Sequence, residues 1–151
     1  MPTAYIGIGS NLGDREENCE RAIEHLVKNG ITVTKRSSMI ETEPWGVQEQ
    51  PKFINMAIET ETGLEPDALL RLLKKIEVEV GRLPTSQWGP RIIDLDILLY
   101  DDIVMRTSEL EIPHPHMSER IFVLKPLAEI APGKIHPVLG KSINDLLSEI
   151  R

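Results

Sequence analysis

An apolar run that carries two aspartates restricts this chain more than any other segment. It reads Ile92-Ile93-Asp94-Leu95-Asp96-Ile97-Leu98-Leu99. Successive side chains of an extended strand point to opposite faces, so Asp94 and Asp96 share one face, about 6 to 7 Å apart. Two ionised carboxylates on a largely buried strand are costly unless a positive charge compensates them. The pattern therefore predicts a strand with one apolar face and one face that binds a cation, most simply a divalent metal ion.

The residues just before this strand are suited to phosphate and to a flat ring. Trp88, Gly89-Pro90 and Arg91 lead directly into it, and Arg82 stands at the other end of the intervening loop. Guanidinium groups bind phosphate oxygens, and an indole ring stacks on flat heterocycles. A short loop with a cation at each end can close over a polyphosphate and exclude water. Because the acidic pair offers only oxygen ligands, Mg²⁺ is the expected metal.

Elsewhere in the chain, two pairs of residues can extend such a site. His114 and Arg120 follow the aspartate strand, although His114 taken alone is equally suited to a structural role. Phe53 and Asn55 stand two residues apart on another expected strand and therefore share a face. An aromatic ring beside a carboxamide can stack on a heterocycle and bond its polar edge.

Composition limits the possible classes of protein. The chain has 151 residues, of which 40% are hydrophobic and 27% charged, as in one ordinary globular domain. A net charge of −7 argues against a nucleic-acid partner, which needs many cationic contacts. Cys19, the only cysteine, falls on the apolar side of an expected helix and reads as a buried thiol. The chain shows no signal-peptide pattern and no apolar run of about 20 residues, so we expect a cytoplasmic protein without a membrane partner.

The order of the expected elements indicates the fold. Strands are expected at 4–9, 31–41, 53–60 and around the aspartates, with helices from Asp14 to about Asn29 and from Pro66 to Gly81. This β-α-β-β-α-β order predicts a ferredoxin-like α+β fold, an antiparallel sheet with both helices on one face. A helical extension follows, with a helix over 118–130 interrupted by Pro126 and a last one from Ser142. We expect a single domain over 1–151.

Two phosphate-binding motifs are only mimicked. In Gly7-Ile8-Gly9-Ser10-Asn11-Leu12-Gly13 the third glycine comes one position too late for a dinucleotide fingerprint. Gly140-Lys141-Ser142 matches the end of a P-loop, but Ile135 occupies the position where a P-loop needs its first glycine. The first motif is better read as a tight turn into a helix.

Taken together, the motifs resemble the 6-hydroxymethyl-7,8-dihydropterin pyrophosphokinase family of folate biosynthesis over nearly the whole chain. The matching segments are Tyr5-Ile6-Gly7-Ile8-Gly9-Ser10-Asn11-Leu12-Gly13, Gln50-Pro51-Lys52-Phe53-Ile54-Asn55, Trp88-Gly89-Pro90-Arg91-Ile92-Ile93-Asp94-Leu95-Asp96-Ile97, Ile112-Pro113-His114 and Arg120-Ile121-Phe122-Val123-Leu124. The resemblance implies a monomeric enzyme that moves the β,γ-pyrophosphate of ATP onto the hydroxymethyl group of the pterin and leaves AMP.

The resemblance also implies roles for individual residues. Asp94 and Asp96 would hold two Mg²⁺ ions, with Arg82 and Arg91 acting mainly in the transition state. The implied ATP-binding residues are Glu77, Arg82, Trp88, Arg91, Ile97, His114 and Arg120. The implied pterin-binding residues are Thr42, Trp45, Phe53, Asn55, Asp94 and Phe122.

The chain departs from the family pattern at three places. The loop segment Leu83-Pro84-Thr85-Ser86-Gln87 lacks basic residues that many members carry. Lys74 replaces an uncharged polar residue of some members, and Pro115-His116 follows His114 where some members have a tyrosine or an arginine. Two other functions stay open from the residues alone. One is another Mg²⁺-dependent phosphoryl-transfer enzyme or a phosphohydrolase, and the other is a non-catalytic ferredoxin-like ligand-binding module.

Overall fold

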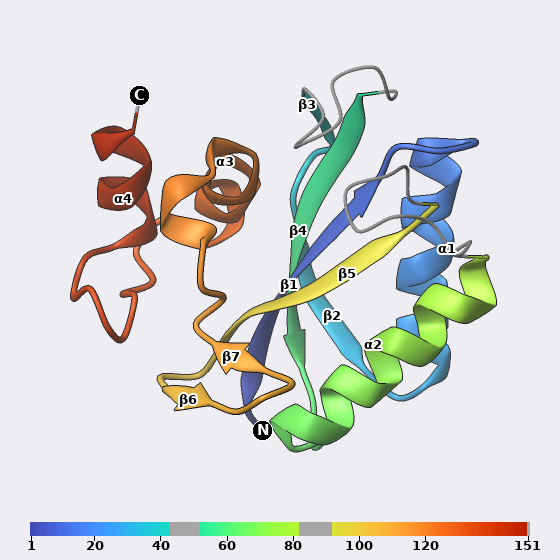
Figure 1. The fold of residues 1–151 in the computed structure, drawn as a ribbon, viewed down its shortest axis with the longest axis horizontal. Helices are drawn as coiled ribbons and strands as arrows, with labels where there is room; N and C mark the ends of the chain where they lie inside the picture. The colour runs from blue at the N-terminus through green and yellow to red at the C-terminus, as the bar shows by residue number, and fades with distance from the viewer. Residues whose placement is uncertain (43–51, 82–91, 151) are drawn as a thin grey trace.

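The computed structural model describes residues 1–42, 52–81 and 92–150. One sheet forms the centre of the molecule (Figure 1). Its strands are β1 (Thr3–Ser10), β2 (Thr32–Arg36), β3 (Ile40–Thr42), β4 (Phe53–Glu61) and β5 (Asp94–Tyr100). The helices are α1 (Arg15–Lys28), α2 (Pro66–Val80), α3 (Ile121–Ile130) and α4 (Ile143–Glu149), with a 3-10 turn at Met117–Glu119. The short strands β6 (Met105–Arg106) and β7 (Glu111–Ile112) form a separate hairpin.

The strand order confirms the ferredoxin-like prediction. The sheet runs β2-β4-β1-β5, with β3 also paired to β4, and every pairing is antiparallel. The first and last strands of the β-α-β-β-α-β unit, β1 and β5, are therefore direct neighbours. This pairing brings the glycine-rich end of β1 beside the two aspartates.

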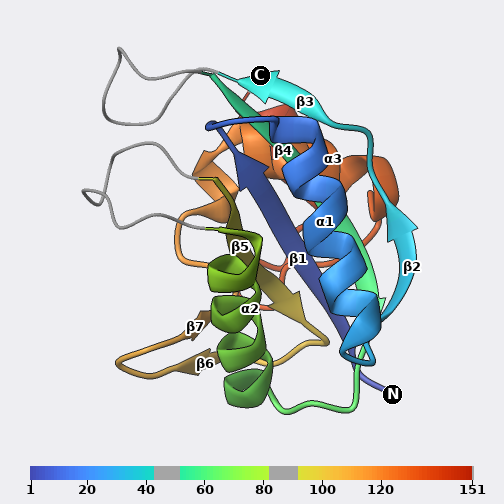
Figure 2. The same cartoon turned by 90° about the vertical axis from the view of Figure 1, so that its right-hand side faces the viewer.

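Helices α1 and α2 lie side by side on one face of the sheet, as expected (Figure 2). Asp14 caps α1 by accepting the Glu17 N–H at 3.2 Å. Pro66 begins α2, and Gly81 ends it with a φ of 113°, in the left-handed region that favours glycine. The apolar stripes of both helices pack on the sheet to form the main core, in which Cys19 is fully buried. Burial raises the pKa of this thiol to about 12, so it is an inert core residue.

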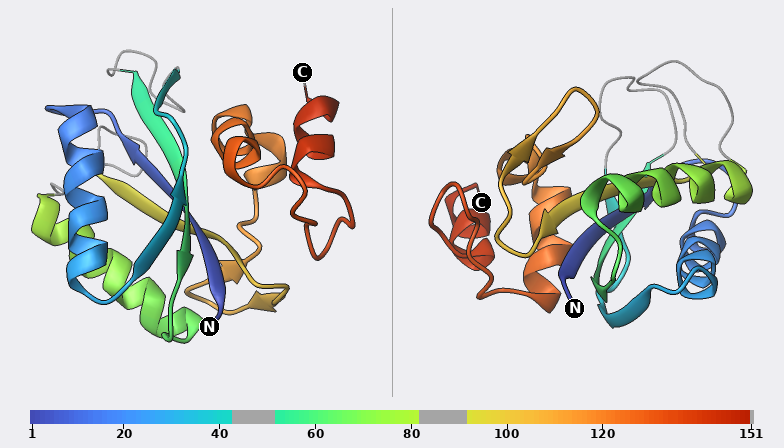
Figure 3. Two further views of the ribbon diagram at one scale, coloured as in Figure 1. Left: turned by 180° about the vertical axis from the view of Figure 1, so that it is seen from behind. Right: turned by 90° about the horizontal axis from the view of Figure 1, so that it is seen from below.

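Helix α3 packs on the opposite face of the sheet, and α4 packs on the outer side of α3 (Figure 3). They form a second apolar cluster with Tyr5, Ala57 and Leu99 from three different strands. Pro126 does not interrupt α3, so that expectation is wrong: the helix continues to Ile130. Packing of its apolar side compensates for the one hydrogen-bond donor that proline lacks.

Two further expectations need correction. The strand expected over 31–41 is divided into β2 and β3, and Ser37 lies at the break. Its N–H donates to the Ala57 carbonyl and its Oγ accepts the Ala57 N–H, each at 2.9 Å. The β6–β7 hairpin was not expected at all. Within the described ranges, no helix is long and apolar enough to cross a membrane.

Candidate active site

Gly9 on β1 lies between two predicted site residues on the neighbouring strands. It pairs with Asn55 of β4 on one side and with Asp94 of β5 on the other. Paired residues share a face of the sheet, so the carboxamide and the carboxylate flank a position without a side chain. A Cβ atom at Gly9 would stand 2.8 Å from Asn55 Oδ1 and 3.6 Å from Phe53 Cδ1. Glycine therefore allows Asn55 and Phe53 to lie over the end of β1.

The two aspartates share this face, as the sequence predicts. Asp96 pairs with Gly7, just as Asp94 pairs with Gly9. Leu95 and Ile97 point to the other face of the sheet, which α1 and α2 cover, and they are 1% and 3% exposed. The sequence-based reading missed the role of these two glycines, because it considered them only as part of a turn motif that follows the strand expected at 4–9. The missed signal is their spacing of two, which leaves one face of a strand bare.

The electrostatics of the acidic pair favour a bound cation. Burial, the nearby charge of Asp94 and that of Glu77 together raise the pKa of Asp96 to about 7. A divalent cation would favour the ionised form, and the all-oxygen donor set fits Mg²⁺. Within the described ranges, no three His, Cys, Asp or Glu side chains gather into a metal-binding group. Two carboxylates suit Mg²⁺, which commonly takes its other ligands from phosphate and water.

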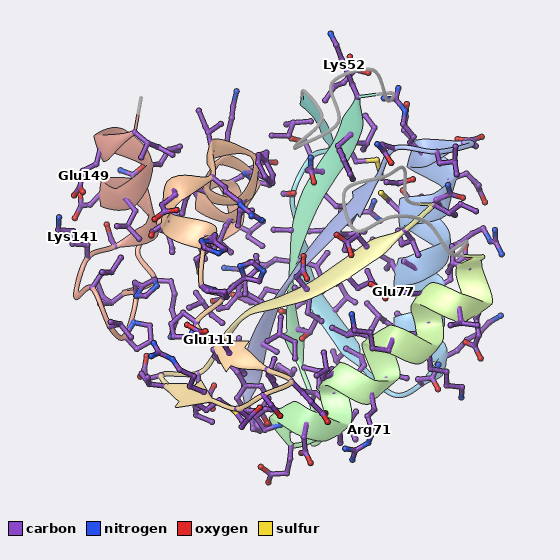
Figure 4. The ribbon with its side chains drawn as sticks, viewed as in Figure 1. Lys52, Arg71, Glu77, Glu111, Lys141 and Glu149 are labelled. Atoms are coloured by element: carbon purple, nitrogen blue, oxygen red, sulfur yellow. The ribbon has the colours of Figure 1, made fainter. Side chains whose placement is uncertain are left out.

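Glu77 is a third carboxylate, supplied by α2 beside β5 (Figure 4). The Leu95 N–H donates to Glu77 Oε2 at 2.8 Å. Lys74 Nζ lies 3.7 Å from Glu77 Oε1. The glutamate side chain is 2% exposed, whereas the lysine side chain is 58% exposed. The structure thus places Glu77 under the aspartate strand rather than on an open surface.

His114 and Arg120 lie near the aspartates, on the segment that leads into α3. The His114 N–H donates to the Leu98 carbonyl at 3.0 Å, which fixes this segment to β5. Burial, helped by the charge of Arg120, lowers the pKa of His114 to about 4, while the charge of Asp94 acts the other way. The Arg120 guanidinium also acts to lower the pKa of Asp96. The arginine lies 5.8 Å from the Phe122 ring centre.

The remaining predicted residues divide into three groups. Thr42 is on β3, paired with Phe53, next to the site. Ile97 is buried in the main core, between the sheet and the helices α1 and α2. Trp45, Arg82, Trp88 and Arg91 lie outside the described residues.

The fold and these side chains define a ferredoxin-like enzyme domain, in which an acidic pair suited to a metal ion adjoins groups suited to a flat heterocycle. The family model described as 7,8-dihydro-6-hydroxymethylpterin-pyrophosphokinase matches residues 5–132. The chain belongs to this family.

Individual relatives and solved structures agree with this assignment. A Bacillus subtilis 2-amino-4-hydroxy-6-hydroxymethyldihydropteridine pyrophosphokinase is 51% identical over 128 residues, which cover 84% of this chain and 77% of the relative. The Aquifex aeolicus protein of the same name is 44% identical over 149 residues, 99% of this chain and 92% of the relative. A crystal structure of wild-type Plasmodium falciparum HPPK-DHPS has the same fold, with a TM-score of 0.78 at 16% identity, over 98% of this chain and 44% of that one.

Proposed function

We propose that this protein transfers pyrophosphate from ATP to the hydroxymethyl group of 6-hydroxymethyl-7,8-dihydropterin, giving AMP and the pterin diphosphate, in folate biosynthesis. The family assignment and the similarity to named pyrophosphokinases support this activity. One observation carries it: the register of β4, β1 and β5 sets Asn55, Gly9 and Asp94 side by side on one face. A group that can bind a flat ring thereby adjoins a group that can bind a metal–phosphate complex.

Asp94 and Asp96 are the residues that would hold two Mg²⁺ ions. When bound, the ions supply charge neutralisation of the ATP phosphate oxygens. The two carboxylates would fix the position of the phosphates relative to the acceptor hydroxyl, and Asp96 would help to remove the proton of that hydroxyl. This arrangement favours in-line attack of the hydroxymethyl oxygen on the β-phosphorus, with AMP as the leaving group. Positioning and charge neutralisation supply most of the catalysis in phosphoryl transfer.

The cationic and neutral donors complete the ATP site. Arg120 supplies a permanent positive charge, while His114, with its low pKa, enters as a neutral imidazole at physiological pH. Arg82 and Arg91, which lie outside the described residues, are assigned to the triphosphate in the transition state. Trp88, which also lies outside the described residues, completes the proposed nucleotide site. The side chains of Glu77 and Ile97 are buried, so neither is part of it.

The pterin is placed between the rings of Phe53 and Phe122. Asn55 would bond its polar edge, because a carboxamide both donates and accepts. Thr42 and Trp45 complete this side of the site, together with Asp94 near the hydroxymethyl group. We expect the enzyme to act as a cytoplasmic monomer without a nucleic-acid or membrane partner.

The nucleotide product tests this proposal. Purified protein is incubated with ATP, Mg²⁺ and reduced hydroxymethylpterin, and the products are separated by ion-exchange chromatography. We expect equal amounts of AMP and pterin diphosphate, and no AMP when pterin or Mg²⁺ is omitted. ADP or free phosphate as the sole product would instead identify a different phosphoryl-transfer enzyme or a phosphohydrolase.

A further inference from the structure

We propose that Glu77 is a positioning residue for the two aspartates: it holds the Asp94–Leu95 peptide from the side of α2 rather than binding nucleotide or metal directly. The inference rests on the proposed function for its catalytic consequence. Its structural part can be tested separately, because it concerns one backbone hydrogen bond.

The first argument is the place of β5 in the sheet. Within the described ranges, β5 is the terminal strand and pairs only with β1. An edge strand has backbone groups that no neighbouring strand can satisfy. At Leu95 this need is met by Glu77 Oε2, which accepts the N–H at 2.8 Å. A bond from a backbone N–H to a carboxylate is stronger than a neutral one, and its loss leaves a buried donor without an acceptor.

The second argument is which peptide unit is held. The Leu95 N–H belongs to the peptide that joins Asp94 to Leu95, and Asp94 is the first residue of β5. The hydrogen bond therefore fixes the start of the strand, between the two carboxylates. A movement here changes the separation of the aspartates and hence the geometry that they offer to a cation.

The third argument is the limited access to the carboxylate. The Glu77 side chain is 2% exposed, and its other oxygen lies 3.7 Å from Lys74 Nζ. Of this ion pair, the lysine is the member that reaches solvent. A residue that acts through the support of metal ligands changes metal affinity or activity about 10- to 100-fold when it is replaced.

Two substitutions separate the position of the acceptor from its charge. Glu77→Gln keeps an oxygen at the same distance along the side chain and removes the charge. Glu77→Asp keeps the charge and withdraws the oxygen by one methylene. We expect the Gln variant to stay within about 3-fold of the native kcat, and the Asp variant to lose about 30-fold. The KM for the pterin should stay within about 2-fold in both variants, because Asn55 and Phe53 are unchanged.

Two further readouts do not depend on turnover. Mn²⁺ binding, followed by electron paramagnetic resonance in the presence of a non-hydrolysable ATP analogue, should weaken about 10-fold in the Asp variant only. Hydrogen exchange of the Leu95 amide, followed by NMR, should accelerate in the same variant. Glu79→Asp is the matched control, since Glu79 lies on the same helix but contacts His25 and Lys75. We expect this control to behave as the native protein.

Opposite behaviour of the two variants would overturn the proposal. An active Asp variant beside an inactive Gln variant would show that the charge itself acts, through direct contact with metal or nucleotide. Native Leu95 exchange in the Asp variant would also overturn it. Failure of the native protein to form AMP would refute the proposed function, while the exchange experiment would still decide the positioning role.

Discussion

One face of the sheet has two ends that differ in chemistry although the same three strands build both. At one end Tyr5, Ala57 and Leu99 pack against α3 and α4. At the other end the same strands present Gly9, Asn55 and Asp94. The alternation of side chains continues along β1 and β4, whereas in β5 a register shift opposite Tyr5 and Ile6 sets both Leu98 and Leu99 in the second cluster. What changes is the identity of the outward residues, from apolar groups that fill space to small or polar groups that leave it open.

One end of this face stabilises the fold, and the other end provides the groups that can bind ligands. The apolar end buries side chains against two helices, and burial of this kind stabilises the fold. The polar end places two carboxylates close together, which costs stability in the absence of a cation. The apolar end thus offsets a cost that the polar end incurs for binding. Substitutions at the two ends should therefore affect different measurements.

The largest expected effect is on turnover, from substitutions of the acidic pair. Asp94→Asn and Asp96→Asn should each lower kcat about 1,000-fold, because a neutral amide is a poor ligand for Mg²⁺ and a poor proton acceptor. Steady-state AMP formation measures the loss, and circular dichroism should show an unchanged fold. Asp102→Asn is the control, since Asp102 follows β5 at its other end and pairs with Lys134 at 2.9 Å. Full activity in either test variant would contradict the proposed metal site.

The apolar end should respond in stability instead. Leu127 on α3 is fully buried in the second cluster. Leu127→Ala should lower the free energy of unfolding by about 3 kcal/mol, through lost burial and a residual cavity. Urea denaturation measures this, and kcat at low temperature should stay within about 2-fold of native. Ile121→Ala, on the exposed side of the same helix, should cost under about 0.5 kcal/mol. Equal losses in both variants would mean that α3 does not stabilise through this face.

The helices and the faces of the aspartate strand can be predicted from the sequence, because they depend on the local periodicity of apolar residues. The apolar stripes predict α1 and α2, and the alternation around Asp94 and Asp96 predicts which face each side chain takes. The structure confirms the helices and the burial of Leu95 and Ile97 under them. The same alternation puts Leu99 with these two residues, and that is wrong, because a register shift in β5 sets Leu99 in the second cluster. Patterns of this kind are set by residues close in sequence.

The remaining features depend on contacts between distant segments. The pairing of Gly9 with both Asn55 and Asp94 follows from register, which a single strand does not encode. The bond from the Leu95 N–H to Glu77 joins a helix to an edge strand, and no spacing rule predicts it. The strands β6 and β7 have two residues each, too few for a period of two to be visible.

The cost at the polar end should appear as a dependence of stability on pH. The pKa of Asp96 is about 7 in the folded protein, above the value of about 3.9 expected for an unfolded chain. The folded state therefore binds the proton more tightly, and its stability falls as pH rises from about 4 to 7. Since the side chain is only partly buried, solvent screening limits the loss to about 2 kcal/mol. Urea denaturation in EDTA measures it, and Asp96→Asn should abolish most of the slope. An Asp96→Asn variant with the same slope as the native protein would show that the folded state does not bind the Asp96 proton more tightly.

The smallest expected effect comes from a substitution of Gly9, which lies between Asn55 and Asp94 at the polar end. Gly9→Ala introduces a Cβ that would stand 2.8 Å from Asn55 Oδ1, so the carboxamide has to move. We expect the KM for the pterin to rise about 10-fold, which equals about 1.4 kcal/mol of lost binding. The KM for ATP should change by less than about 2-fold, because the carboxylates stay in place. Steady-state kinetics with each substrate varied in turn separates the two constants.

The matched control for this substitution is Gly63→Ala, where a Cβ would meet only the flexible end of Met1 at 4.0 Å. It adds the same methyl group away from the site and should leave both constants unchanged. Asn55→Ala should raise the KM for the pterin at least as much as Gly9→Ala does. Combining the two substitutions should add little, because the glycine acts only through the carboxamide. Fully additive effects would instead show that the new methyl group excludes the pterin directly. Pterin binding would then depend on the open space over β1 rather than on the orientation of Asn55.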